Sequence, residues 1–284
     1  MGTSIERPSN GNILLTVTIP WEDVSKAYEE ALAKVALETE IPGFRKGKAP
    51  KEKVEQALDK NKLYEEVLKK LIPLVFSKAV SEFELKPIIS PRITLKKAKE
   101  KEPWILEVIT CEKPRVTLGD YKKPILELKK TKQAKIWVPG QDKKEPSEEE
   151  KKPTLDELLD VVFQNVKTQL PPILLEQEVT KSLSNLIDQT RKLGLTVEQY
   201  LTSTGKTSEG LRLEYEKEAQ RTLTLEFALM EIAEQEGITV EEKDINDIVD
   251  GAKTPEEKKA LQNERYYLAS ILRRQKTIQY LASL

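Results

Sequence analysis

The segment from Pro139 to Pro153, PGQDKKEPSEEEKKP, contains no aliphatic residue and therefore cannot join an apolar core. It divides the 284-residue chain into two parts that fold by different rules. Charged residues make up 33% and hydrophobic residues 38%, against usual values of about 25% and 45–50%. That balance predicts thin cores with much surface, which is typical of extended helical proteins.

The part before this segment reads as a small α+β domain. Apolar residues alternate over residues 13–19, as in a half-buried strand, and then recur at helical spacing over residues 24–35. Proline is favoured in the first helical turn, so a second helix is expected to begin at Pro50. The remaining elements expected here are a long helix over residues 62–83, which Pro73 can kink, and strands over residues 87–95 and 104–111.

The part after the segment reads as all helix. Four expected helix starts carry a capping box, in which Ser or Thr is followed three residues later by Glu or Gln. These pairs are Thr154 with Glu157, Thr196 with Gln199, Thr239 with Glu242, and Thr254 with Glu257. Long helices are expected over residues 211–236 and 266–284, packed as hairpins. We expect domains at residues 1–113 and 153–284, joined by a linker over 114–152 that holds a strand at Ile125–Leu128.

The composition excludes much catalytic chemistry. The chain has no His, which removes Ser-His-Asp triads and imidazole metal ligands, and its one Cys, Cys111, excludes a disulfide within the chain. Gly205-Lys206-Thr207 ends like a phosphate-binding loop, but Tyr200 stands where the pattern requires Gly, so a turn between helices is expected. We therefore expect no catalytic residue, no metal and no cofactor.

A short basic segment is the most distinctive feature of the first domain. Residues 43–53 hold five basic residues and one Glu, and four chain-breaking residues shape the run IPGFRKGKAP: Pro42, Gly43, Gly47 and Pro50. Phe44 then lies beside Arg45, Lys46 and Lys48 on a tight turn. A ring among cations suits a surface of RNA phosphate and protein. A solvated Lys-rich turn with a tucked Phe remains the alternative.

The run GFRKGKAP resembles the ribosome-binding signature of bacterial trigger factor, Gly-Phe-Arg-x-Gly-x-x-Pro, and matches every fixed position. The segments VTLGDYK at residues 116–122 and LPPIL at residues 170–174 also resemble that family. The resemblance implies an α+β ribosome-binding domain followed by an elongated all-α domain with projecting helical arms. It also implies that the residues that bind the ribosome are Gly43, Phe44, Arg45, Lys46, Gly47, Lys48 and Pro50.

One departure from the family is large. Trigger factors usually carry an FKBP-like prolyl-isomerase domain between these two regions, on the order of 100 residues long. Only the 15 residues from Pro139 to Pro153 could stand in its place. Because so few residues cannot form such an enzyme domain, we expect no isomerase activity.

The function that the resemblance implies is that of a ribosome-associated holdase. Its expected partners are the large ribosomal subunit, as protein and RNA near the exit tunnel, and nascent or unfolded polypeptides. The helical region is expected to bind these clients. No membrane segment or secretory signal is visible, so the cytoplasm is the expected location. The rival interpretation is a helical adaptor that binds one folded partner, and self-association is left open.

Overall fold

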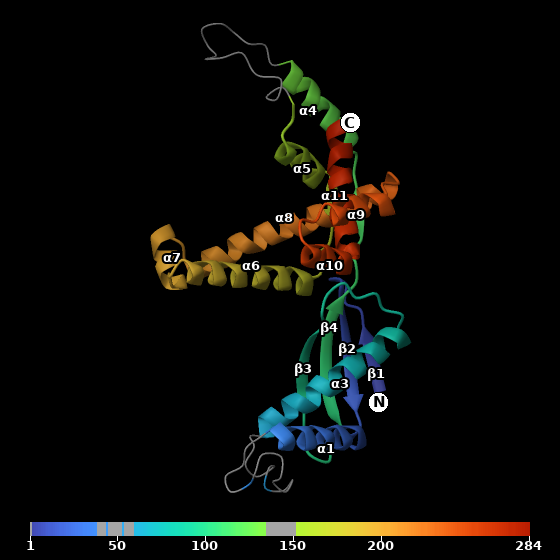
Figure 1. Ribbon diagram of the computed structural model, residues 1–284, viewed down its shortest axis with the longest axis vertical. Coiled ribbons are helices and arrows are strands. Elements are labelled where there is room, and N and C mark those ends of the chain that lie inside the picture. Colours follow the sequence, from blue (N-terminus) through green and yellow to red (C-terminus); the bar gives the residue numbers. More distant parts are fainter. Residues whose placement is uncertain (1, 39–43, 45–52, 54–59, 135–151) are drawn as a thin grey trace. The chain divides into compact units, whose positions relative to one another are not determined.

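The computed structural model describes residues 2–38, 44, 53, 60–134 and 152–284 of the chain. It divides into two compact units, one formed by Met1–Lys113 with Pro171–Leu174, the other by Pro114–Leu170 with Leu175–Leu284. The expected helix start at Pro50 and most of the aliphatic-free segment lie outside the described residues. The α+β fold class is confirmed, since the first unit combines a sheet with helices and the second is mainly helical (Figure 1).

The first unit contains a four-stranded antiparallel sheet in the order β1-β2-β4-β3. Its strands are β1 (Gly2–Glu6), β2 (Asn12–Ile19), β3 (Arg92–Lys97) and β4 (Trp104–Cys111). β1 was not predicted, because its five residues carry little apolar alternation. The strand expected from residue 87 begins only at Arg92, after two prolines at positions 87 and 91 that cannot donate to a sheet ladder.

Two helices, α1 (Trp21–Glu38) and α3 (Lys60–Glu82), lie across one face of this sheet (Figure 1). The side chains of β2 alternate between the two faces of the sheet, as the sequence predicts. Leu15, Val17 and Ile19 face the core and are almost fully buried. Val24 of α1 and Val67 of α3 complete the same core. α3 continues through Pro73, which lies inside the helix.

A short segment from later in the chain completes the first unit. Pro171–Leu174 is grouped with it, and the Ile173 backbone N–H donates to the Asn12 side-chain oxygen at 3.3 Å. Gly11 has a positive φ of 85°, and a Cβ there would lie 3.2 Å from Pro171 Cγ. Glycine therefore serves both the turn and this close approach.

The second unit is built mainly from helices. In chain order its elements are β5 (Val116–Leu118), α4 (Lys122–Gln133), α5 (Leu155–Gln164), β6 (Val166–Thr168), α6 (Pro172–Lys192), α7 (Val197–Thr204), α8 (Ser208–Gln235), α9 (Glu242–Asp250), α10 (Pro255–Asn263) and α11 (Arg265–Ser283). β5 and β6 pair as a two-stranded antiparallel ribbon. α6 and α8 run as a hairpin joined through α7 (Figure 1).

Two expectations for this unit are wrong. Ile125–Leu128 is not a strand but part of α4, because Ile125 and Leu128 lie three residues apart and pack into one helical core cluster. The region after Thr154 is not all helix, since β6 interrupts it. A three-residue strand whose partner lies 50 residues earlier leaves no local signal, so the sequence pattern could not show it.

The capping predictions have mixed outcomes. Thr154 and Thr196 each form the complete capping box with Glu157 and Gln199. Thr254 accepts from the Glu257 backbone, but the Glu257 carboxylate accepts from Lys253 instead of the cap residue.

The cap predicted at Thr239 is wrong. α9 begins two residues later, where the Glu241 backbone N–H donates to Asp244. The end of α8 extends its hydrogen bonding to Ile238, whose N–H donates to Ala233, and Thr239 accepts from Lys276. Thr239 is therefore still part of the connection after α8.

Candidate functional site

The two described helices that flank the signature segment in the sequence, α1 and α3, pack against each other. Two ion pairs join α1 to α3, Glu30 with Lys70 and Lys34 with Glu66, the latter at 3.5 Å. From the first pair to the second, the residue number on α1 rises from 30 to 34 while that on α3 falls from 70 to 66. The two helices therefore run antiparallel. The end of α1 therefore lies beside the start of α3. We call this pair, α1 and α3, the stem.

An aromatic stack ties the stem to the sheet. The ring of Tyr64 on α3 lies 6.3 Å from that of Tyr28 on α1 and 5.1 Å from that of Trp104 on β4, edge-on in the second contact. Trp104 is 1% exposed and is the largest fully buried side chain. Such pairs contribute about 0.5–1.5 kcal/mol beyond their buried area. Because Tyr64 lies in the second turn of α3, the stack holds the stem close to where the segment returns.

The charges on the stem are also arranged across it. Glu66 accepts from Lys69 on its own helix at 2.6 Å and from Lys34 on α1 at 3.5 Å. The hydrogen bond from Lys69, together with both positive charges, lowers the pKa of the Glu66 carboxyl. Glu66 therefore stays ionised over the physiological pH range and keeps its attraction for both lysines.

Of the predicted site residues, the structure places one. Phe44 is 42% exposed. Gly43, Arg45, Lys46, Gly47, Lys48 and Pro50 lie outside the described residues. Their role stays a prediction from the sequence, and the structure describes the two helices, α1 and α3, that flank them in the chain.

A second candidate surface lies on the second unit, where several large apolar side chains are exposed. On α11, Tyr266 is 91% exposed, Tyr267 61% and Ile271 40%. Leu193, Leu195 and Leu213 are also exposed, at and near the connection between α6 and α8. We call Tyr266, Tyr267 and Ile271 the α11 apolar surface. The sequence showed these residues as apolar but could not separate exposed from buried ones.

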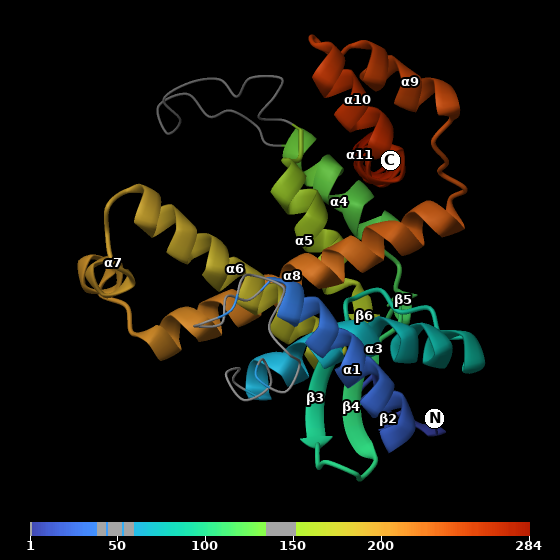
Figure 2. The same ribbon diagram turned by 60° about the horizontal axis from the view of Figure 1, so that its bottom comes forward.

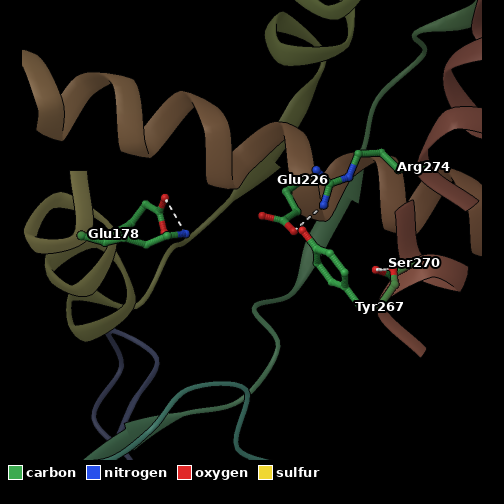
Figure 3. A network of polar contacts seen from close by, with 6 residues as sticks. Glu178, Glu226, Tyr267, Ser270 and Arg274 are labelled. Atoms are coloured by element: carbon green, nitrogen blue, oxygen red, sulfur yellow. Dashed lines mark hydrogen bonds and ion pairs between the residues drawn. The ribbon is translucent and has the colours of Figure 1, made fainter. Parts of the chain in front are cut away.

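An ion pair joins the helix that carries this surface to α8 (Figure 3). Arg274 on α11 pairs with Glu226 on α8 at 2.8 Å, and the Ser270 hydroxyl donates to the Tyr267 backbone carbonyl at 2.7 Å. Glu178, on α6, pairs with Lys181 one turn further along the same helix at 3.5 Å. The tyrosines are therefore presented from a helix that an ion pair anchors to α8.

One carboxylate joins three segments of the second unit. Glu236, directly after α8, accepts hydrogen bonds from the hydroxyls of Tyr121 at 3.0 Å and Tyr280 at 2.7 Å, and it pairs with Lys122 at 2.8 Å. We call these four residues the Glu236 node. Hydrogen bonds from Lys122 and Tyr280 lower the pKa of Glu236. Burial, followed by the bond to Glu236, raises the pKa of Tyr121.

The turn at Gly205 and the buried Cys111 agree with the sequence predictions. Gly205 ends α7 in the left-handed region with φ of 64°, and Thr207 caps α8, so this segment is a turn between helices. Cys111 is fully buried, and burial raises its thiol pKa to about 11. Among the described residues, no group of three or more Cys, Asp and Glu side chains could hold a metal ion, and no helix is long and apolar enough to cross a membrane.

Comparison with known proteins gives matches along almost the whole chain. The family model described as bacterial trigger factor protein matches residues 1–136, and that of the bacterial trigger factor C-terminus matches residues 140–283. The chain belongs to the bacterial trigger factor family. The two matches leave only residues 137–139 between them, and neither is a prolyl-isomerase domain.

Curated trigger factors share this similarity. Those of Staphylococcus aureus strains JH9 and Newman are each 28% identical over 245 residues, covering 83% of this chain and 54% of theirs. The chain thus spans about half the length of the curated relatives it matches. A solved structure titled "Promiscuous Substrate Recognition in Folding and Assembly Activities of the Trigger Factor Chaperone" has a TM-score of 0.65 at 16% identity. That match covers 100% of this chain and 99% of that one, and it shows a shared fold.

Some structurally important residues of this chain were missed by sequence reasoning. Trp104, Tyr64 and Glu236 act through contacts with residues far away in the chain, and no local pattern marks such contacts. Tyr64 and Trp104 are 40 residues apart, and Tyr121 and Glu236 are 115 apart. An aromatic residue at an inward position of a helix or strand was the only signal available for the stem.

The Glu236 node gives a test by pH. The folded pKa of Glu236 is lowered, so its contribution to stability is present above the unfolded pKa, near 4.3, and is lost as pH falls through the folded value. Glu236→Gln should lower the free energy of unfolding at pH 7 by about 1–2 kcal/mol, because charged hydrogen bonds become neutral ones. Urea denaturation of both proteins from pH 7 to pH 3 measures this difference.

The difference in free energy of unfolding between the wild type and Glu236→Gln should narrow as the pH falls below about 4. Glu226→Gln is a suitable control, because it removes a partly exposed carboxylate that has one ion-pair partner on α11. If the difference in free energy of unfolding between the wild type and Glu236→Gln stays constant down to pH 3, the role assigned to the ionised Glu236 is wrong.

Proposed function

We propose that this chain is a ribosome-associated chaperone that holds unfolded polypeptides and does not act as an enzyme. Residues 1–113 would bind the ribosome and residues 153–284 the client, with 114–152 between them, and the protein would work in the cytoplasm, where the ribosomes are. The observation that carries the proposal is the complete signature at residues 43–50 in a chain of the trigger factor family.

The chemistry of the signature supports docking to the large subunit near the exit tunnel. Arg45, Lys46 and Lys48 can pair with RNA phosphate, while the exposed ring of Phe44 can enter an apolar crevice in ribosomal protein. The helical-adaptor alternative gains no support from the family membership.

Client binding is proposed for the α11 apolar surface. Unfolded polypeptides share apolar side chains and no common motif, so a surface of scattered apolar residues among polar ones suits them. Burying one large apolar side chain contributes about 1.5–3 kcal/mol. Two or three such contacts contribute about 3–9 kcal/mol before the cost of association is subtracted. Binding is therefore no tighter than micromolar, about −8 kcal/mol, which allows release.

The docking proposal predicts loss of ribosome binding in the triple variant Phe44→Ala, Arg45→Ala, Lys46→Ala. Co-sedimentation with ribosomes should fall at least tenfold, and the far-UV circular dichroism should stay unchanged, because exposed substitutions rarely alter stability. Wild-type binding should also weaken as salt rises, since phosphate contacts release counterions.

A matched control is Leu74→Ala, Lys78→Ala, Lys99→Ala, which removes one exposed apolar side chain and two cations elsewhere on the first unit. This control should bind like the wild type. If both variants lose binding equally, docking depends on overall charge and the signature has no special role.

The holding proposal predicts that the purified chain slows aggregation of several unrelated unfolded proteins in the absence of ribosomes. The triple variant Tyr266→Ser, Tyr267→Ser, Ile271→Ser should need at least threefold more protein for equal protection, because it loses three exposed apolar contacts. Light scattering of diluted, denatured clients measures the effect.

The control for this assay is Leu37→Ser, Leu74→Ser, Ile88→Ser, which removes three exposed apolar residues from the first unit. It should protect clients as well as the wild type. Loss of protection in this variant alone would move client binding to the first unit, and protection of one client only would favour an adaptor.

The absence of isomerase activity is inferred from the family matches, which leave no room for an FKBP-like domain between residues 136 and 140. Lowering the barrier of about 18–20 kcal/mol to prolyl rotation requires a formed pocket around the bond. Refolding of a proline-limited protein should therefore proceed at its uncatalysed rate, with an FKBP-type isomerase as positive control. Acceleration by this chain would contradict the inference.

A further inference from the structure

The helices α9 and α10 are held to α11 by a small core of their own. Ile245 and Val249 of α9 and Leu268 of α11 are the buried members of this cluster. Four half-buried side chains surround them: Val240, Leu261, Ala269 and Leu272. Figure 2 shows α9 and α10 lying beside α11. Every apolar member comes from residues 240–272, so the cluster is separate from the one built on α8.

The main cluster of the second unit is larger. It has eight buried side chains, from Tyr121 and helices α4, α5, α8 and α11: Tyr121, Ile125, Leu158, Val162, Ala228, Leu229, Ile232 and Leu281. The half-buried Leu118 of β5 and Val166 of β6 pack against them. A region with few buried apolar contacts opens more easily than one with many. α9 and α10 should therefore separate from α11 at a lower free-energy cost than is needed to unfold the α8 cluster.

The chain is shaped to turn at both ends of these helices. Before α9, Gly237 adopts a left-handed φ of 65° after α8. The Ile238 backbone carbonyl that follows accepts from Arg273 at 2.9 Å, so the connection itself is tied to α11. After α10, Glu264 alone separates α10 from α11. Rotation about these two points moves α9 and α10 together.

Polar contacts hold the pair closed. Lys276 on α11 pairs with Asp244 on α9, and Arg265 on α11 donates to Asn246 at 2.9 Å. Within the pair, Lys258 on α10 joins Asp250 on α9 at 2.8 Å. The first two contacts hold the pair to α11, whereas the third holds α9 to α10. Both side chains of the Lys276–Asp244 pair are about one-third exposed, so salt can screen it.

We propose that α9 and α10 form a hinged flap, which opens from α11 as one unit and uncovers Leu268 and Leu272. The Lys276–Asp244 ion pair is its latch. Leu268 follows Tyr267 directly, and Leu272 follows Ile271, so opening enlarges the α11 apolar surface on the same helix. A role for this enlarged surface in client binding rests on the proposed function. The opening itself does not.

Native-state hydrogen exchange of the full chain tests the flap. Once undocked, α9 and α10 have only nine residues each, too few to stay helical alone. Amides of residues 242–263 should therefore exchange through an opening that exposes less surface than global unfolding, whereas residues 228–232 of α8 should exchange only with the whole unit. Asp244→Asn removes the charge of the latch but keeps a side-chain oxygen to accept the Glu241 N–H. Protection of the flap amides should fall about two- to fivefold in this variant, with α8 unchanged.

Salt and a control variant separate the latch from general destabilisation. Raising the ionic strength should lower flap protection in the wild type and have little effect in Asp244→Asn. Glu226→Gln removes the Arg274 ion pair, which links α11 to α8 outside the flap, and should leave flap protection unchanged. Equal protection and equal denaturant dependence for residues 242–263 and 228–232 would overturn the proposal, as would equal losses at both in Asp244→Asn.

Discussion

The second unit depends on burial around almost the whole circumference of one stretch of α8. Between positions 223 and 233, seven side chains are buried: Leu223, Thr224, Phe227, Ala228, Leu229, Ile232 and Ala233. A helix that is buried all round must have other elements on several sides. The ribbon of β5 and β6, helix α5 and helix α11 supply them. α8 thus acts as the axis of this unit, and the Glu236 node fastens the segments that meet at its end.

The first unit depends on a simpler arrangement, in which two helices pack on one face of an antiparallel sheet. Strong alternation in β2 and β4 made these strands predictable from the sequence, and so did the helical spacing in α1 and α3. Where the prediction failed, the local sequence did not favour one structure over another. Ile125–Leu128 is a short apolar run that fits a strand or a helix equally well until its neighbours are known. The cap predicted at Thr239 does not form, because Ile238 is hydrogen-bonded to the end of α8 and Thr239 accepts from Lys276 of α11.

The candidate site was predictable in part. The signature at residues 43–50 is local, and its residue types indicate phosphate and apolar contacts without any structure. The stem depends on pairs such as Lys34–Glu66 and Tyr64–Trp104, which the fold brings together from distant positions. The α11 apolar surface could not be predicted either, because Tyr267 and Leu268 are both apolar neighbours on one helix, and packing alone leaves the first exposed and buries the second.

The single cysteine has a practical consequence. Cys111 is inaccessible at the end of β4, and only a small fraction of a thiol with a pKa of about 11 is ionised at neutral pH. The folded chain should therefore react very slowly with maleimides and other thiol reagents. A cysteine introduced at any exposed position would carry a dye or spin label at that site alone. Reaction at Cys111 would in turn report that the sheet of the first unit has come apart.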